Sequence, residues 1–243
     1  MRRIRIQLRA ELMLLARNGE QLLLTLIIPI LLLGFFGSVD VLPSADMEPI
    51  QIQFLTPGVL AIAIMSSSMV SLGIATGFER SYLVLKRLGA TPLTRSELVI
   101  AKILSVFTVQ LIQAIILLSL GLALGWQPGG STWPLAIVVV LFGTSAFAGI
   151  GLILAGQLRA EINLAAQNGL YLVLLLLGGM VIPRDSLPDF LGNAVQGLPS
   201  TALADLLRST LNGDNAGLVV PCAVLAAWGI IAPAIAARRF RWS

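Results

Sequence analysis

The sequence predicts an all-α membrane protein with six transmembrane helices, and two observations lead to this fold class. First, 57% of the 243 residues are hydrophobic and the mean hydropathy is +0.92, which is more apolar side chain than a water-soluble domain of this length can bury. Second, the apolar residues gather in runs of about 20, the length that a helix needs to cross a bilayer. We expect a single membrane domain over residues 1–243, with spans at residues 21–38, 55–78, 99–125, 134–156, 164–182 and 217–237.

The basic residues are distributed unevenly between the two ends of the predicted spans. Fourteen of the 16 Lys and Arg residues fall on the side that carries both termini and the connection between the second and third spans. The other side has only Arg184 and Arg208, together with seven of the twelve acidic residues. Because Lys- and Arg-rich segments stay in the cytoplasm, we expect a multi-pass protein of the cell (cytoplasmic) membrane with both termini cytoplasmic. The positive net charge then reflects topology, and no nucleic-acid partner is expected.

Residues 1–18 predict an amphipathic helix that lies in the cytoplasmic interface of the membrane. Ile4, Leu8, Leu12 and Leu15 recur at helical spacing, with arginines around them. This pattern is typical of a helix in contact with lipid headgroups and the ends of acyl chains. A frayed basic anchor that serves only topology is the alternative.

The predicted spans contain no Asp, Glu, Lys or Arg away from their ends. Ion-coupled carriers need buried ionisable groups, so the pattern argues against such a carrier and against catalysis within the membrane, and we expect no catalytic residue. The sequence has no histidine and one cysteine, so we expect no metal site. The polar residues inside the spans are Ser66, Ser67, Ser68, Gln110, Gln113, Gln167 and Asn168. They either bond within the helices or form a surface for amphipathic cargo.

Two further patterns concern packing and energy supply. The spacings Gly73–Gly77 and Gly121–Gly125 each form G-x-x-x-G, which lets helices approach closely, within one subunit or between two. No phosphate-binding G-x-x-x-x-G-K-[ST] motif occurs, and the longest loop, residues 183–216, is too short for a nucleotide-binding domain. If the movement of a cargo costs energy, a separate protein must therefore supply it.

The connection between the second and third spans combines basic residues with signals that end and begin helices. Residues 79–89 predict a short amphipathic helix that ends at Gly89 in the left-handed conformation. Thr91-Pro92 predicts a rigid turn, and residues 94–97 match a capping box at the start of the next helix. Such a corner could lodge in the groove of a partner, or it could be a well-capped loop, and the physical signals leave both open.

This segment, FERSYLVLKRLGATPLTRSELVIAK, resembles the signature of ABC-2-type permeases, the membrane subunits of ABC exporters. The matching residues are Glu79, Arg80, Leu85, Thr91, Pro92, Leu93, Arg95, Glu97 and Lys102. A second resemblance follows the fifth span, in IPRDSLPDFLGNAVQGLPSTALADLLR, where the matching residues are Pro183, Leu187, Pro188, Leu191, Pro199, Thr201 and Arg208. Together with the six-span layout, the resemblance covers nearly the whole chain.

The resemblance implies a coupling helix at about residues 79–90 that docks onto a cytoplasmic ABC ATPase. Two copies of this ATPase would bind ATP and Mg²⁺, while the chain itself would need no cofactor and would not be an enzyme. A second permease subunit, identical or homologous, would complete the transporter, with membrane lipid around it. The residues expected to transmit the ATPase motion are Glu79, Arg80, Leu85, Leu88, Gly89, Thr91, Pro92, Arg95 and Glu97.

The resemblance also implies where cargo passes. Spans two and five would line the path, with Met65, Ser66, Met69, Asn168 and Tyr171 as candidate residues. Short re-entrant helices between spans five and six would form an outer gate that includes Pro183, Pro188, Phe190, Pro199 and Arg208. By residue pattern alone, these helices could equally be a surface cap. Pro199 would end the first of them, and Ser200 would cap the second, which would end at Asn212-Gly213.

The sequence therefore predicts a permease subunit of an ATP-driven exporter of an amphipathic or apolar substrate such as a drug, natural product or lipid. Multidrug or antibiotic resistance would be one consequence of such export. Two alternatives remain: an ATP-independent carrier or channel, and a non-transporting membrane scaffold for an ATPase.

Overall fold

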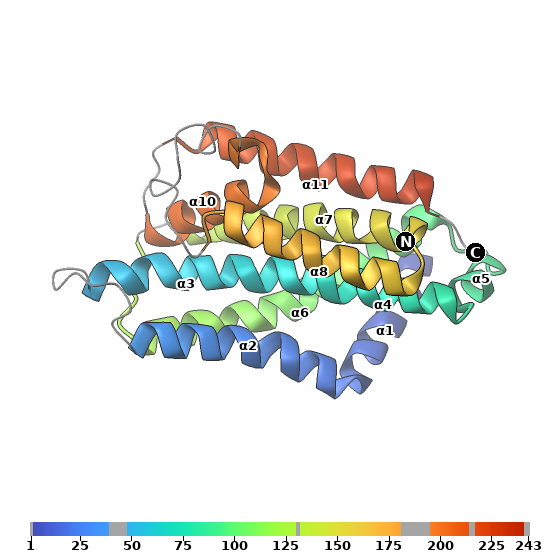
Figure 1. Ribbon diagram of the computed structural model, residues 1–243, viewed down its shortest axis with the longest axis horizontal. Helices are drawn as coiled ribbons and strands as arrows, with labels where there is room; N and C mark the ends of the chain where they lie inside the picture. Colours follow the sequence, from blue (N-terminus) through green and yellow to red (C-terminus); the bar gives the residue numbers. More distant parts are fainter. Residues whose placement is uncertain (1, 39–47, 130–131, 181–194, 214–216, 241–243) are drawn as a thin grey trace.

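A computed structural model of the chain describes residues 2–38, 48–129, 132–180, 195–213 and 217–240, and these residues form helices and connections without a strand (Figure 1). The helices in the first part of the chain are α1 (Arg2–Arg17), α2 (Gly19–Ser38), α3 (Glu48–Met65), the π-helix η1 (Ser66–Ser71), α4 (Leu72–Ser81) and α5 (Val84–Gly89). The remaining helices are α6 (Arg95–Ala123), α7 (Trp133–Gln157), α8 (Ala160–Leu177), the 3₁₀ turn η3 (Val195–Gly197), α10 (Pro199–Asn212) and α11 (Val219–Arg239).

Five helical segments of the described chain are long and apolar enough to cross a membrane. They are Ile52–Ser81, Arg95–Ala123, Pro134–Gln157, Ala160–Leu177 and Val219–Arg239, which correspond to the second to sixth predicted spans. The first predicted span lies within α2, where the apolar helix Thr25–Ser38 is shorter than the other five. A count of six spans therefore stays a prediction.

The long helices run side by side, and the unit α3–η1–α4 passes through the middle of the bundle (Figure 1). In the most apolar part of Ile52–Ser81, 72% of the residues are buried, against 22% for Ala160–Leu177 and for Val219–Arg239. Since α8 and α11 expose large apolar side chains such as Leu172, Leu176, Ile230 and Ile231, these faces suit contact with lipid. The central unit α3–η1–α4 is thus the protein core, and α8 and α11 lie at its periphery.

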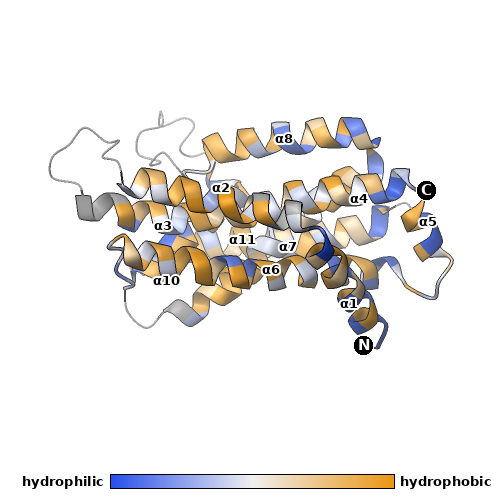
Figure 2. Ribbon diagram, turned by 90° about the horizontal axis from the view of Figure 1, so that it is seen from below, coloured by the Kyte–Doolittle hydropathy of each residue, from blue (hydrophilic) through white to orange (hydrophobic). Residues whose placement is uncertain are grey.

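Both ends of the chain lie at the same end of the bundle as α5, and α10 lies toward the opposite end (Figure 1). Hydrophilic residues gather on α1 and around α5 (Figure 2). This common end is the one that the distribution of basic residues predicts to be cytoplasmic.

The N-terminal segment forms a helix, as predicted, and α1 packs against α6 and α2. Ile4, Leu8, Leu12 and Leu15 are half-buried, so the predicted apolar face is the one that meets the bundle. Ile6 and Leu14 are 62% and 59% exposed, which leaves apolar side chains on the outside of α1. Its place in the membrane interface remains a prediction.

The prediction of one continuous helix over residues 79–89 that ends at a left-handed Gly89 is wrong. Leu83 takes the left-handed conformation, with φ of 61°, and separates α4 from the six-residue α5. Gly89 is the last residue of α5, and Ala90 follows with φ of −80°. The chain therefore turns at Leu83, six residues earlier than the glycine signal indicates.

At the opposite end, α10 ends where the sequence predicts but begins earlier than predicted. Pro199 is the first residue of the helix, and Gly213 ends it with φ of 81°, a conformation that glycine adopts without a steric cost. The prediction that Ser200 caps this helix is wrong, because Leu198 occupies the cap position and no side chain caps it. The preceding predicted gate residues Pro183, Pro188 and Phe190 lie outside the described residues.

Candidate functional site

The corner between α4 and α6 presents an exposed surface at the basic end of the bundle. Tyr82 and Leu83 are 71% and 53% exposed, and the basic residues Lys86 and Arg87 beside them are also exposed. Large apolar side chains next to cations, outside the spans, are typical of a surface that binds a partner. Tyr82 is held in place by its ring, which stacks on Phe78 at 6.1 Å between centroids.

Leu85, by contrast, faces into the protein. It has no exposed surface and belongs to an apolar cluster with Leu72, Leu98 and Phe240. Leu88 is half-buried and packs against the same cluster. These two residues anchor α5 to the bundle, so neither can provide the main contact with a partner, and that role falls to their exposed neighbours.

Side-chain hydrogen bonds hold the corner in one shape. The predicted capping box is confirmed, because Glu97 N donates to Thr94 Oγ1 at 3.2 Å and Thr94 N donates to Glu97 Oε2 at 2.8 Å. Thr91 Oγ1 donates to the Leu88 carbonyl at 2.6 Å. A capping box satisfies two backbone donors at a helix start, so the start of α6 is well defined.

The corner is also tied to other parts of the bundle. Arg3 Nη1 of α1 donates to the Pro92 carbonyl at 2.8 Å. Arg80 Nη1 donates to the carbonyl of Ala155, near the end of α7, at 3.0 Å. A displacement of the corner would therefore also pull on α1 and α7 through these hydrogen bonds.

A buried ion cluster lies directly behind the corner. Lys102 of α6 is 1% exposed, and its Nζ lies 3.2 Å from Glu11 Oε2 of α1 and 2.8 Å from Glu79 Oε2 of α4. The same Nζ donates to Glu79 Oε1 at 3.0 Å. The expectation of spans without ionisable groups away from their ends missed this residue, because Lys102 stands near the start of a predicted span and its partners are remote in sequence. One lysine thus joins three helices.

The serine-rich segment of the second span forms the π-helix η1 and has a structural role. Ser67 Oγ donates to the Ala63 carbonyl at 2.8 Å, and Ser68 Oγ donates to the Ile64 carbonyl. From α6, Gln110 Nε2 reaches Ser67 Oγ at 2.9 Å and the Ile64 carbonyl at 3.1 Å. Because a π-helix leaves carbonyls out of the regular ladder, these side chains satisfy them inside the bundle.

The G-x-x-x-G spacing of α4 packs within the chain against amide side chains of α8. A Cβ on Gly73 would lie 2.1 Å from Gln167 Nε2, and a Cβ on Gly77 would lie 2.5 Å from Asn163 Nδ2. Asn163 Nδ2 donates to the Gly73 carbonyl at 2.9 Å. A Cβ on Gly121 would meet Thr56 of α3, whereas a Cβ on Gly125, beyond the end of α6, would meet nothing within 4 Å. Gly73, Gly77 and Gly121 therefore serve contacts inside one subunit.

The structure does not gather the candidate path residues on one surface. Met65 and Met69 have no exposed surface and belong to the main apolar core. Ser66 and Tyr171 are half-buried, whereas Asn168 is exposed and donates to the Leu164 carbonyl of its own helix at 2.9 Å. In this arrangement the two methionines are part of the protein core.

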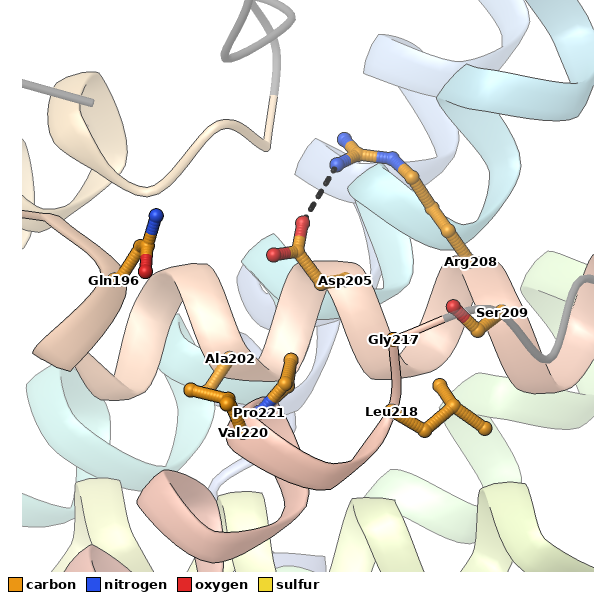
Figure 3. Close-up of a pocket in the computed structure, with 9 residues that line it drawn as sticks. All are labelled: Gln196, Ala202, Asp205, Arg208, Ser209, Gly217, Leu218, Val220 and Pro221. Carbon is orange, nitrogen blue, oxygen red and sulfur yellow. Dashed lines mark ion pairs between the residues drawn. The ribbon is translucent and has the colours of Figure 1, made fainter. Parts of the chain in front are cut away.

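At the other end, Arg208 of α10 ties three elements together. Its Nη2 donates to the carbonyls of Gly179 and Met180, at 2.6 and 3.1 Å, and its guanidinium stands 3.7 Å from the centre of the Phe54 ring of α3. Figure 3 shows Asp205 and Arg208 projecting from α10 toward each other, at the rim of a cavity of about 430 Å³ that the start of α11 also lines. Burial lowers the pKa of Arg208 to about 10, so the side chain stays charged at neutral pH.

Comparisons with known proteins agree with this geometry. A family model described as "ABC-2 type transporter" matches residues 2–212. The chain is 26% identical over 192 residues to the putative transport permease YvfS of Bacillus subtilis (strain 168), which covers 79% of this chain and 78% of that protein. It is 25% identical over 177 residues to the probable multidrug ABC transporter permease YbhS of Escherichia coli (strain K12), which covers 71% of this chain and 46% of that protein.

Proposed function

The chain belongs to the ABC-2 type transporter family, and from this premise we propose that it is the permease subunit of an ATP-driven exporter in the cytoplasmic membrane. A separate cytoplasmic ABC ATPase, present in two copies, binds ATP and Mg²⁺ and supplies the energy. The corner and both termini face this ATPase. The observation that carries the proposal is the exposed, well-capped corner at residues 82–97.

The proposed coupling runs from the corner into the bundle. The ATPase contacts Tyr82, Leu83 and the basic residues that follow them. Leu85 passes the motion of α5 to the apolar cluster around it, since its side chain is fully buried there. The ion pairs of Glu79 and Lys102 pass it to α4, α6 and α1. The corner therefore moves as one body with the ends of three helices.

The complete exporter contains two permease subunits, this chain with a copy of itself or with a homologous chain. Cargo passes along their interface, at surfaces of the second and fifth predicted spans. An amphipathic or apolar cargo fits this path, because the buried polar residues in the described part of the long helices are neutral except for Lys102, which is paired. The name of YbhS, a probable multidrug permease, is consistent with drug-like cargo.

The decisive experiment tests whether the corner binds an ATPase. The full-length chain is expressed with a candidate ABC ATPase from the same organism and purified through a tag, and co-purified ATPase is quantified. The double variant Tyr82→Asp with Leu83→Asp should lose the ATPase, because two charges would replace the exposed apolar contact. The matched control is Gln157→Asp, at an exposed position near the end of α7, which should retain it. Full retention by the double variant would exclude the corner as the docking surface.

Two further measurements address the alternatives. Transport in vesicles that contain this chain without any ATPase would establish an ATP-independent carrier or channel. An ATPase that binds the chain but keeps the same turnover in vesicles with cargo would indicate a scaffold. The exporter instead requires transport that depends on ATP, and a turnover that changes with cargo.

A further inference from the structure

A cleft opens between the N-terminal helix and the bundle, beside the corner. Its volume is about 550 Å³, within the range of about 300–1,000 Å³ typical of ligand pockets. Glu11 and Arg17 of α1, Glu79 of α4, Leu88 of α5 and Lys102 of α6 all line it. These four helices, which are separate in the sequence, therefore build one concave surface at the basic end of the bundle.

A smaller apolar cavity continues this cleft along α2 and α6. Its volume is about 280 Å³, and it shares the lining residues Leu15, Thr25 and Val109 with the larger cleft. Leu26 and Ile112 line its other walls. Because the two cavities share three lining residues, they lie next to each other, and we call the pair the groove. It has a charged end and an apolar end, which is the complement of an amphiphile.

The charges at the wide end favour a zwitterion. Glu11 and Glu79 share the single ammonium of Lys102, so two carboxylates oppose one buried cation, and an excess negative charge away from bulk water is costly. A second cation inside the cleft would relieve that cost. Arg17 lines the same cleft, and a guanidinium binds phosphate through paired hydrogen bonds.

We propose that this groove binds a phospholipid whose headgroup ends in a primary ammonium, as in phosphatidylethanolamine. The ammonium lies against Glu79 and Glu11, the phosphate lies against Arg17, and an acyl chain fills the apolar part beside Leu26 and Ile112. A primary ammonium donates three hydrogen bonds, whereas the trimethylammonium of phosphatidylcholine donates none. The proposed lipid site does not depend on the proposed function.

The test compares two lipids with identical acyl chains. The full-length protein is delipidated and titrated with phosphatidylethanolamine or phosphatidylcholine, and bound lipid is counted by native mass spectrometry. We expect about tenfold tighter binding of phosphatidylethanolamine, the value of one hydrogen bond to a charged group. Glu79→Gln should remove this preference, and Arg17→Gln should weaken the binding of both lipids. The matched control Glu161→Gln, at an exposed position on α8, should change neither.

A second measurement needs no variant and covers the case in which Glu79→Gln fails to fold. Thermal unfolding of the unmodified protein in mixed micelles should show a larger rise in Tm with phosphatidylethanolamine than with phosphatidylcholine. Equal rises in Tm with the two lipids would overturn the proposal. A preference for phosphatidylethanolamine that persists in both variants, or that is lost in the Glu161→Gln control, would also overturn it. Displacement of the lipid by dodecylammonium, with affinity unaffected by Arg17→Gln, would also overturn it, because the groove would then recognise only an amphipathic cation.

Discussion

Lys102 Nζ lies 2.8 Å from Glu79 Oε2, in a position where the lysine is 1% exposed. The pair joins the start of α6 to the end of α4 on either side of the corner, and Glu11 joins α1 to the same ammonium. An exporter that is driven from its cytoplasmic face needs such a rigid connection, because a flexible one would absorb the motion. The first prediction therefore concerns Lys102, which holds this connection together.

Lys102→Met should destabilise the protein strongly. The change leaves the buried Glu11 and the partly exposed Glu79 without their cation, and breaking a buried pair in this way costs about 3–5 kcal/mol. Thermal unfolding in detergent measures the effect. Lys86→Met, at an exposed position of α5, is the matched control and should stay within about 0.5 kcal/mol. Equal stability of the two variants would show that the cluster is not formed.

Leu83→Gly should leave the protein as stable or slightly more stable. A left-handed leucine costs about 1–2 kcal/mol, which glycine does not incur, although the greater freedom of glycine in the unfolded chain offsets part of the gain. Val84→Gly, in the helical first turn of α5, is the control and should lose up to about 1 kcal/mol. A loss of stability at position 83 that matches the loss at 84 would contradict the left-handed turn.

Leu85 and Tyr82 should respond differently to alanine. Leu85→Ala removes a fully buried side chain and should cost about 2–5 kcal/mol of stability. Tyr82→Ala, at a position that is 71% exposed, should change stability little and weaken the proposed ATPase association. Parallel measurements of Tm and of co-purified ATPase separate the two effects. If Tyr82→Ala lowered the stability and Leu85→Ala weakened only the ATPase association, Leu85 would face outward and Tyr82 inward.

Two glycine-to-alanine changes test the packing of α4 on α8. At Gly73 the new Cβ would meet Gln167 Nε2 at 2.1 Å, whereas at Gly169 it would meet nothing within 4 Å. Gly73→Ala should therefore destabilise the protein by about 1–3 kcal/mol. Gly169→Ala should stabilise it by up to about 1 kcal/mol through helix propensity. Thermal unfolding of both variants gives the comparison. An increase in the stability of Gly73→Ala would show that α8 does not pack on α4 at this position.

Arg208→Lys should loosen the end of the bundle that lies away from the termini. Lysine keeps the charge but cannot reproduce the planar guanidinium, which bonds to the Gly179 and Met180 carbonyls and stacks on Phe54. We expect faster hydrogen exchange in peptides that span residues 171–180 and 200–212. Peptides from α1 serve as the internal reference and should not change. Unaltered exchange at both sites would show that these contacts are dispensable.

Several features of the candidate site could be predicted from the sequence because they depend on neighbours in the chain. The capping box of Thr94 and Glu97 and the end of α10 at Gly213 were both predicted, since each is defined by residues within one or a few turns. The end of the corner helix was predicted incorrectly. Gly89 is the stronger local signal for a left-handed turn, but burial of Leu85 against remote partners places that turn at Leu83.

The sequence by itself determined the all-helical class, the second to sixth membrane-crossing segments and the family, because hydrophobic length and short-range motifs are properties of continuous segments. Only the tertiary structure decided that Lys102 has Glu11 and Glu79 as partners, that Leu85 faces inward while Tyr82 faces outward, and that Gly73 packs on Gln167. These partners lie 91 residues apart for Lys102 and Glu11 and 23 residues apart for Lys102 and Glu79. Such contacts arise only when the helices pack, since helical periodicity fixes which residues share a face but not which neighbour covers it.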